Sequence, residues 1–110
     1  MRTWSPTEAG PGEPLVGIAL ADEDRAFVER CCLEVGTRAV AGSGLLGLAG
    51  LCLGHTARRF GRLDDRSVAL AEALAARAEA DPADVDGRAL DGLGDIRFHL
   101  RRTRAGSAGE

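Results

Sequence analysis

The sequence predicts an all-α protein, and three observations support this prediction. Aromatic residues make up only 4% of the 110-residue chain, so the core must come from Leu, Val and Ala, which suit helix packing better than sheets. Apolar residues recur at helical spacings of three and four, and no strand pattern competes with them. Aspartates precede and glycines follow these segments, as at helix ends. We expect four helices, at about residues 23–35, 39–60, 65–80 and 82–102, in a single domain over residues 21–103.

The first 20 residues are expected to form a poorly ordered leader. Three prolines and two glycines between positions 6 and 14 oppose a continuous helix. The apolar stretch over residues 15–20 leaves two options open, because it either docks on the core as an extended or short helical segment or stays undocked. At the other end, residues 104–110 are small and polar, and we expect a mobile tail.

The helix at 23–35 has a start signal, an apolar stripe and a stop signal. Asp22 or Asp24 can accept hydrogen bonds from the unpaired backbone donors at its start. Gly36 is expected to end it. The inner stripe consists of Val28, Cys31, Cys32 and Val35.

The helix at 39–60 contains no Asp, Glu, Lys or Arg between positions 39 and 57. That length would span a bilayer. However, three features argue against membrane insertion: the high glycine content, His55, and arginines at both ends. A helix that is apolar on all sides can equally be the buried central helix of a globular domain. We expect a central buried helix, no membrane span, and Gly61 as its C-terminal cap.

The helix at 65–80 is rich in Ala and Leu, which favour helix. Asp64 or Asp65 is expected to cap it. Its predicted inner stripe is Val68, Ala71, Leu74, Ala75 and Ala78.

The helix at 82–102 has the clearest start signal in the chain. Asp81 is the expected N-cap, Pro82 the first helical residue, and Asp84 follows three residues after the cap. Its predicted inner stripe is Ala89, Leu93, Ile96 and Leu100.

Two segments carry a resemblance to a known family. The first includes Cys52-Leu-Gly54-His55-Thr-Ala57-Arg58, and the second spans residues 87–98 and contains Asp95-Ile96-Arg-Phe98. Over residues 22–100 the chain resembles small bacterial HEAT-repeat-like proteins. This resemblance implies an α-solenoid fragment of two antiparallel helix hairpins. It also implies a binding role, because some similar proteins are thought to be immunity partners of toxins.

The chain departs from that family pattern at several places. Gly92 and Gly94 occupy positions where a helix former is expected, and residues 37–44 are unusually rich in glycine. Two repeats are also fewer than the three that a stable stack normally needs. The fold would therefore close as a bundle or be completed by forming a homodimer.

Missing residue types narrow the chemistry. The chain has 14 Arg but no Lys, Asn, Gln or Tyr. It therefore lacks a Schiff-base lysine, a phenolic acid, and amide side chains for an oxyanion hole or a base edge. Three cysteines, two of them adjacent, do not form a secreted disulfide framework, and the N-terminus shows no signal-peptide pattern. We expect a cytoplasmic, non-catalytic protein without a cofactor.

Cys52 and His55 form the main candidate for metal or thiol chemistry. Their i, i+3 spacing places them near each other on a helix, and Cys31 or Cys32 could supply a further zinc ligand. A single Cys-x-x-His is a weak signal, so we favour a buried apolar thiol and a hydrogen-bonded imidazole. A Cys–His nucleophile is disfavoured because an apolar segment raises the pKa of a thiol. We assign no metal site.

The charged residues Asp84, Arg88, Asp91 and Asp95 share one face of the helix at 82–102. Ion pairs of Arg88 with Asp84 and with Asp91 are expected at these spacings. The alternatives are a solvated surface network and an acidic binding face. Our functional hypothesis is a protein-interaction module that binds its protein partner along this face. A toxin-immunity role is the form of this hypothesis that the family resemblance implies.

Arginines gather at the end of the same helix. Arg97, Arg101 and Arg104 align at spacings of four and three, with Arg102 beside them. They complement the helix dipole, or they contact phosphates in a nucleic-acid-associated regulator. The net charge of −3 and the absence of interleaved aromatics argue against nucleic acid.

Overall fold

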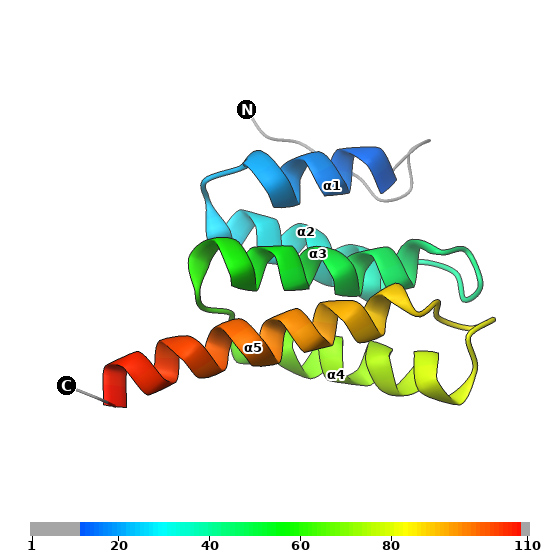
Figure 1. Ribbon diagram of the computed structural model, residues 1–110. Coiled ribbons are helices and arrows are strands. Elements are labelled where there is room, and N and C mark those ends of the chain that lie inside the picture. The colour runs from blue at the N-terminus through cyan, green and yellow to red at the C-terminus, as the bar shows by residue number, and fades with distance from the viewer. Residues whose placement is uncertain (1–11, 109–110) are drawn as a thin grey trace.

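Helix α3 (Leu45–Phe60) lies at the centre of the computed structural model, and every other described helix packs against it (Figure 1). The structure describes the backbone of residues 12–108 and the side chains of residues 15–100. Within that part of the chain there are five helices and no strand, which confirms the all-α prediction and adds one helix to the expected four. The other helices are α1 (Gly12–Ala21), α2 (Arg25–Arg38), α4 (Asp65–Ala80) and α5 (Arg88–Ala108).

Helix α1 is the additional element, and it lies where a poorly ordered leader was expected. Leu15 and Ala19 are fully buried, so residues 15–20 dock on the core as a helix. Pro14 does not prevent this, because it lies in the first turn of α1, where proline is tolerated. Arg59 of α3 donates a hydrogen bond from Nη1 to the carbonyl oxygen of Ala19 over 2.8 Å, which satisfies an acceptor at the end of α1. The rest of the expected leader, residues 1–11, lies outside the described part.

Helix α2 confirms one of the two caps proposed for it. The carboxylate of Asp24 accepts a hydrogen bond from the backbone nitrogen of Phe27 over 3.2 Å, and the whole predicted inner stripe is buried. Gly36 does not end the helix, which continues to Arg38. A Cβ atom at Gly36 would lie 2.6 Å from Cδ2 of Leu70, so this glycine allows α4 to approach α2 closely.

Helix α3 begins at Leu45, six residues later than expected. Gly42 and Gly44 have φ angles of +79° and +86°, a left-handed conformation that interrupts a right-handed helix. The loop is held in place by a 2.9 Å hydrogen bond from the nitrogen of Gly42 to the carbonyl oxygen of Asp84. Gly61 caps the other end with φ +71°, as predicted. No helix in the described part is long and apolar enough to cross a membrane.

Helix α4 has the predicted bounds. Asp64 is the N-cap, and its carboxylate accepts a hydrogen bond from the nitrogen of Arg66 over 2.9 Å. Four of the five predicted inner residues are buried, and Val68 is half-buried.

Helix α5 begins at Arg88, so the predicted start at residue 82 is wrong. The Asp81 carboxylate does accept a hydrogen bond from the Ala83 nitrogen, but it caps only a single turn. The turn ends where Val85, 1% exposed, enters the core. Asp86 then provides the cap of α5, accepting a hydrogen bond from the nitrogen of Arg88 over 2.9 Å.

The predicted apolar register of α5 is nevertheless correct. Ala89, Leu93 and Ile96 are buried, and Leu100 packs at the edge of the core. The backbone helix continues to Ala108, through most of the segment expected to be a tail, and its end projects beyond α3 and α4 (Figure 1).

Glycines bring α3 and α5 into close contact. A Cβ atom at Gly50 would lie 3.0 Å from the Cα of Ala89, and one at Gly54 would lie 2.8 Å from the Cα of Gly92. Gly92 therefore occupies a position where only glycine fits between the two backbones.

Candidate functional site

The predicted pairing of Asp84 with Arg88 is wrong. Asp84 lies in the turn before α5 and forms a two-point contact with Arg77 of α4, with Nε–Oδ2 and Nη2–Oδ1 distances of 2.8 and 2.7 Å. Hydrogen bonding from Arg77 lowers the pKa of the Asp84 carboxyl. This ion pair closes the connection between α4 and α5.

Arg88 does not pair with Asp91 either. It contacts Asp86, with Nε–Oδ1 and Nη2–Oδ2 distances of 3.0 and 2.8 Å, and donates to the carbonyl oxygen of Gly44 over 2.8 Å. Arg88 thus fastens the loop before α3 to the start of α5. Its hydrogen bonds lower the pKa of Asp86.

The two remaining members of the predicted acidic face differ in exposure. Asp91 is exposed, whereas Asp95 is half-buried beside Gly54 of α3. Asp84 and Arg88 form their ion pairs with Arg77 and Asp86, so the predicted charge network along this face is not formed, while binding of a partner along it stays a prediction.

Cys52 and His55 are held in separate surroundings. Cys52 is fully buried, and burial raises the pKa of its thiol to about 12 despite the opposing charge of Arg88. His55 accepts a hydrogen bond at Nδ1 from Nη2 of Arg58 over 2.7 Å. Partial burial and then the Arg58 charge lower the pKa of His55, with Asp95 opposing them.

The other two cysteines are also buried. Burial, followed by the nearby Cys52, Cys31 and Glu29, raises the pKa of Cys32. Buried, protonated thiols are poor nucleophiles. In the described part of the chain, no three His, Cys, Asp or Glu side chains come together as a metal site would require.

Only one of the C-terminal arginines can be placed by its side chain. Arg97 is exposed and lies on a groove between α4 and α5. The side chains of Arg101, Arg102 and Arg104 lie outside the described residues.

The larger of the grooves described here runs between α2 and α4 and has a volume of about 740 Å³. Its floor contains the apolar side chains of Ala26, Leu33 and Leu70. The remaining lining residues are Arg25, Glu29, Arg30, Glu34, Thr37, Arg38, Asp64 and Arg66.

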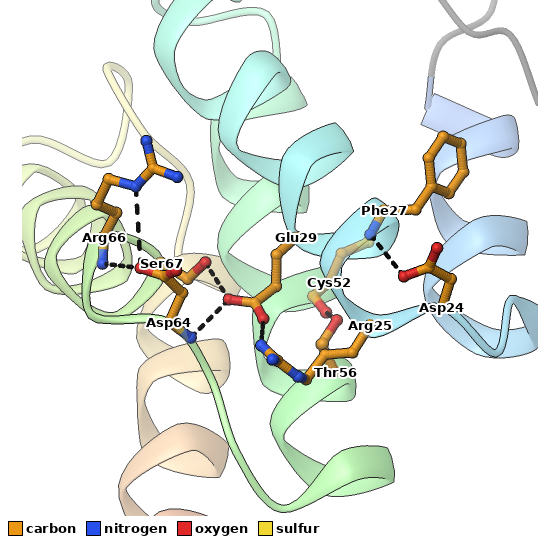
Figure 2. Close-up of polar contacts among 9 residues, drawn as sticks. All are labelled: Asp24, Arg25, Phe27, Glu29, Cys52, Thr56, Asp64, Arg66 and Ser67. Carbon is orange, nitrogen blue, oxygen red and sulfur yellow. Dashed lines mark hydrogen bonds and ion pairs between the residues drawn. The ribbon is translucent and has the colours of Figure 1, made fainter.

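A buried carboxylate sets the position of the two groove walls. Glu29 of α2 is 3% exposed, and its Oε1 accepts hydrogen bonds from the backbone nitrogen of Asp64, over 2.7 Å, and from the hydroxyl of Ser67 (Figure 2). Its Oε2 forms an ion pair with Arg25. Glu29 therefore joins α2 to the first turn of α4 and satisfies its own charge in doing so.

The groove rim carries guanidinium groups. Arg66 is 82% exposed at its side chain and approaches Asp64 only to 3.8 Å, while Arg30 lies over the ring of Phe27 at 5.6 Å. Within residues 15–100 the structure shows no ion pair for Arg30 or Arg38. Glu34 adds one carboxylate to the same rim.

The sequence alone does not predict this groove. The one signal for it was Leu33, an apolar residue on α2 outside the inner stripe, where it extends the groove floor. Comparisons of the chain with protein-family models, curated proteins and solved structures found no match. The geometry of the groove is therefore the basis for the functional proposal.

Proposed function

We propose that this chain is a non-catalytic protein-interaction module that binds an acidic polypeptide segment in the α2–α4 groove. The supporting observation is the combination of an apolar floor, including Leu33 and Leu70, with exposed guanidinium groups at Arg30, Arg38 and Arg66. Arginine binds carboxylates in a two-point geometry, and the floor offers a place for an apolar anchor. The groove lining has four arginines and three acidic residues, a small positive excess in a chain whose net charge is −3, so the groove favours an acidic partner locally.

The composition of the groove supports binding in preference to catalysis. Its lining residues include no Cys or His. The Glu29 carboxylate is already saturated by contacts, and the Thr37 hydroxyl donates to the carbonyl oxygen of Leu33 over 2.8 Å. General acid–base chemistry needs a titrating group within reach of its substrate, and none of these side chains is poised for it.

For the fold, we propose that helices α2 to α5 form two HEAT-like hairpins. This arrangement is supported by the packing of α2 on α3 and of α4 on α5, with α3 also packed on α5 and α2 on α4. The most specific version of the proposed binding function is a toxin-immunity role. This version is supported by the family resemblance in residues 49–58 and 87–98. Co-purification with the product of the neighbouring gene would test that version directly.

The groove itself is tested with three affinity baits. They are the wild-type chain, an Arg30→Glu/Arg38→Glu variant, and an Arg62→Glu control that reverses an exposed arginine outside the groove. We expect one protein in stoichiometric amount on the wild-type and control baits, and its loss from the groove variant. Equal recovery on all three baits, or salt-dependent retention of DNA in place of a protein, would overturn the proposal.

A further inference from the structure

The outer face of the α4–α5 hairpin carries a second groove, of about 330 Å³. Its lining residues are Glu72, Ala75, Ala76, Glu79, Leu90, Leu93, Gly94 and Arg97. None of these residues lines the α2–α4 groove. A molecule bound here would therefore leave the proposed partner groove open.

The floor of this second groove suits another helix. Leu90 is 40% exposed although it is a large apolar residue, and three of the other lining residues, Ala75, Ala76 and Gly94, are small. A Cβ atom at Gly94 would have nothing within 4 Å, so the space above this residue is open. Helices can approach closely where Ala and Gly line the contact, and an incoming apolar side chain would cover Leu90.

Charges of opposite sign lie at one end of the groove. Helices α4 and α5 run in opposite directions (Figure 1). Along the groove, the first lining residue of α4 therefore lies beside the last lining residue of α5. Glu72 and Arg97 are therefore at one end, and Glu79 and Leu90 at the other. In the described part of the chain no ion pair joins Glu72 or Arg97 to another residue.

This arrangement is self-complementary. Consider a two-fold axis that runs along the groove, parallel to the helices. Rotation about it places α4 of one copy opposite α5 of the other, and residues at the same height along the groove stay at the same height. Glu72 of each copy would then face Arg97 of the other, so that two equivalent ion pairs flank a floor of small and apolar side chains. Such a contact is isologous and closes as a dimer.

We propose that the α4–α5 face is a homodimer interface in which a second copy of this chain is the occupant. The resulting four-helix contact covers Leu90 and pairs the charges of Glu72 and Arg97 across the axis. The second copy thereby adds its own helix pairs to the two pairs of the first copy. Short helical repeats are stabilised by such neighbouring repeats.

The test is the solution mass of the full chain by light scattering over a range of concentrations. We expect wild type to reach twice the 11.5 kDa chain mass. Glu72→Arg and Arg97→Glu should each weaken the dimer at least about tenfold, because each places like charges opposite one another twice. Arg38→Glu, an arginine reversal on the other groove, should leave the mass unchanged.

Mixing separates this interface from a general effect of charge. Equimolar Glu72→Arg and Arg97→Glu chains should form a heterodimer, since each pair of opposed residues again has opposite signs. The doubly substituted Glu72→Arg/Arg97→Glu chain should recover the homodimer. A monomeric wild type at the highest soluble concentration, or failure of both the mixture and the double variant to associate while folded by circular dichroism, would overturn the proposal.

Discussion

Gly92 of α5 lies directly against the carbonyl oxygen of Gly50 on α3, and a Cβ atom at Gly92 would overlap that oxygen. Two residues further along the same helix, a Cβ atom at Gly94 would have nothing within 4 Å. These two glycines share a helix but differ in what surrounds them. Their substitution therefore separates close backbone packing from helix propensity.

We expect Gly92→Ala and Gly94→Ala to have opposite effects on stability. The first forces α3 and α5 apart and should cost about 1–3 kcal/mol of unfolding free energy, as overpacking does. The second should add about 0.8–1 kcal/mol, because Ala is the better helix former and the space is open. Urea unfolding, at a dilution where light scattering gives the monomer mass, measures both. A stabilising Gly92→Ala would contradict the close packing of α3 on α5.

Glu29 is expected to be among the most sensitive positions of the fold. Glu29→Ala leaves the backbone nitrogen of Asp64 without its acceptor and Arg25 without its partner, so we expect a loss of about 3–5 kcal/mol. Glu29→Gln keeps one acceptor oxygen but loses the charge, and should cost less, about 1.5–3 kcal/mol. Thermal and chemical unfolding followed by circular dichroism would measure these changes.

The control for Glu29 is an exposed glutamate near the start of the same helix. Glu23→Ala removes a side chain at the surface and should change stability by no more than about 0.5 kcal/mol. If Glu29→Ala were as mild as Glu23→Ala, the contacts of Glu29 with Asp64 and Ser67 would not be what holds α2 to α4.

The ion pair between Asp84 and Arg77 predicts a pH dependence. Because Arg77 lowers the pKa of Asp84 below its ordinary 3.8, the folded state favours the ionised carboxyl. The pair therefore contributes stability above about pH 4, and this contribution is lost as pH falls through the folded-state pKa. A carbon-detected NMR titration of Asp84 should give a lower pKa in wild type than in Arg77→Ala. Arg66→Ala should leave the titration of Asp84 unchanged, and an equal pKa in wild type and Arg77→Ala would refute the coupling.

The sequence predicted local features well because their partners are close in the chain. Asp24 and Asp64 cap helices through residues two or three positions away, and the stripe of α2 follows from its spacing. The start of α5 was misplaced because Asp81 carries a correct local signal, but the turn it caps ends where Val85 is buried in the core. Burial of that kind depends on the whole fold.

The candidate site was harder to predict because its contacts are distant in sequence. Glu29 bonds to groups 35 and 38 residues away, and nothing in its neighbourhood marks it as buried. Asp84 and Arg88 were paired by their spacing, yet each found a partner that helical periodicity does not identify: Arg77 across the connection, and Asp86 with Gly44. The close approach of α2 to α4 beside the groove also depends on Gly36, where a Cβ atom would lie 2.6 Å from Cδ2 of Leu70, 34 residues away in sequence.

The buried thiols give a last prediction, because their reactivity reports on the stability of the whole fold. Cys31, Cys32 and Cys52 are all buried, and burial raises the pKa of Cys52 to about 12. Iodoacetamide reacts with the thiolate, so the folded chain should resist labelling at neutral pH, as measured by intact mass, and react fully in guanidinium chloride. Labelling that does occur under native conditions should follow the population of unfolded molecules. It should therefore be faster in Gly92→Ala and slower in Gly94→Ala. Rapid labelling of folded wild type at a rate equal in all three proteins would show that a thiol is accessible without unfolding.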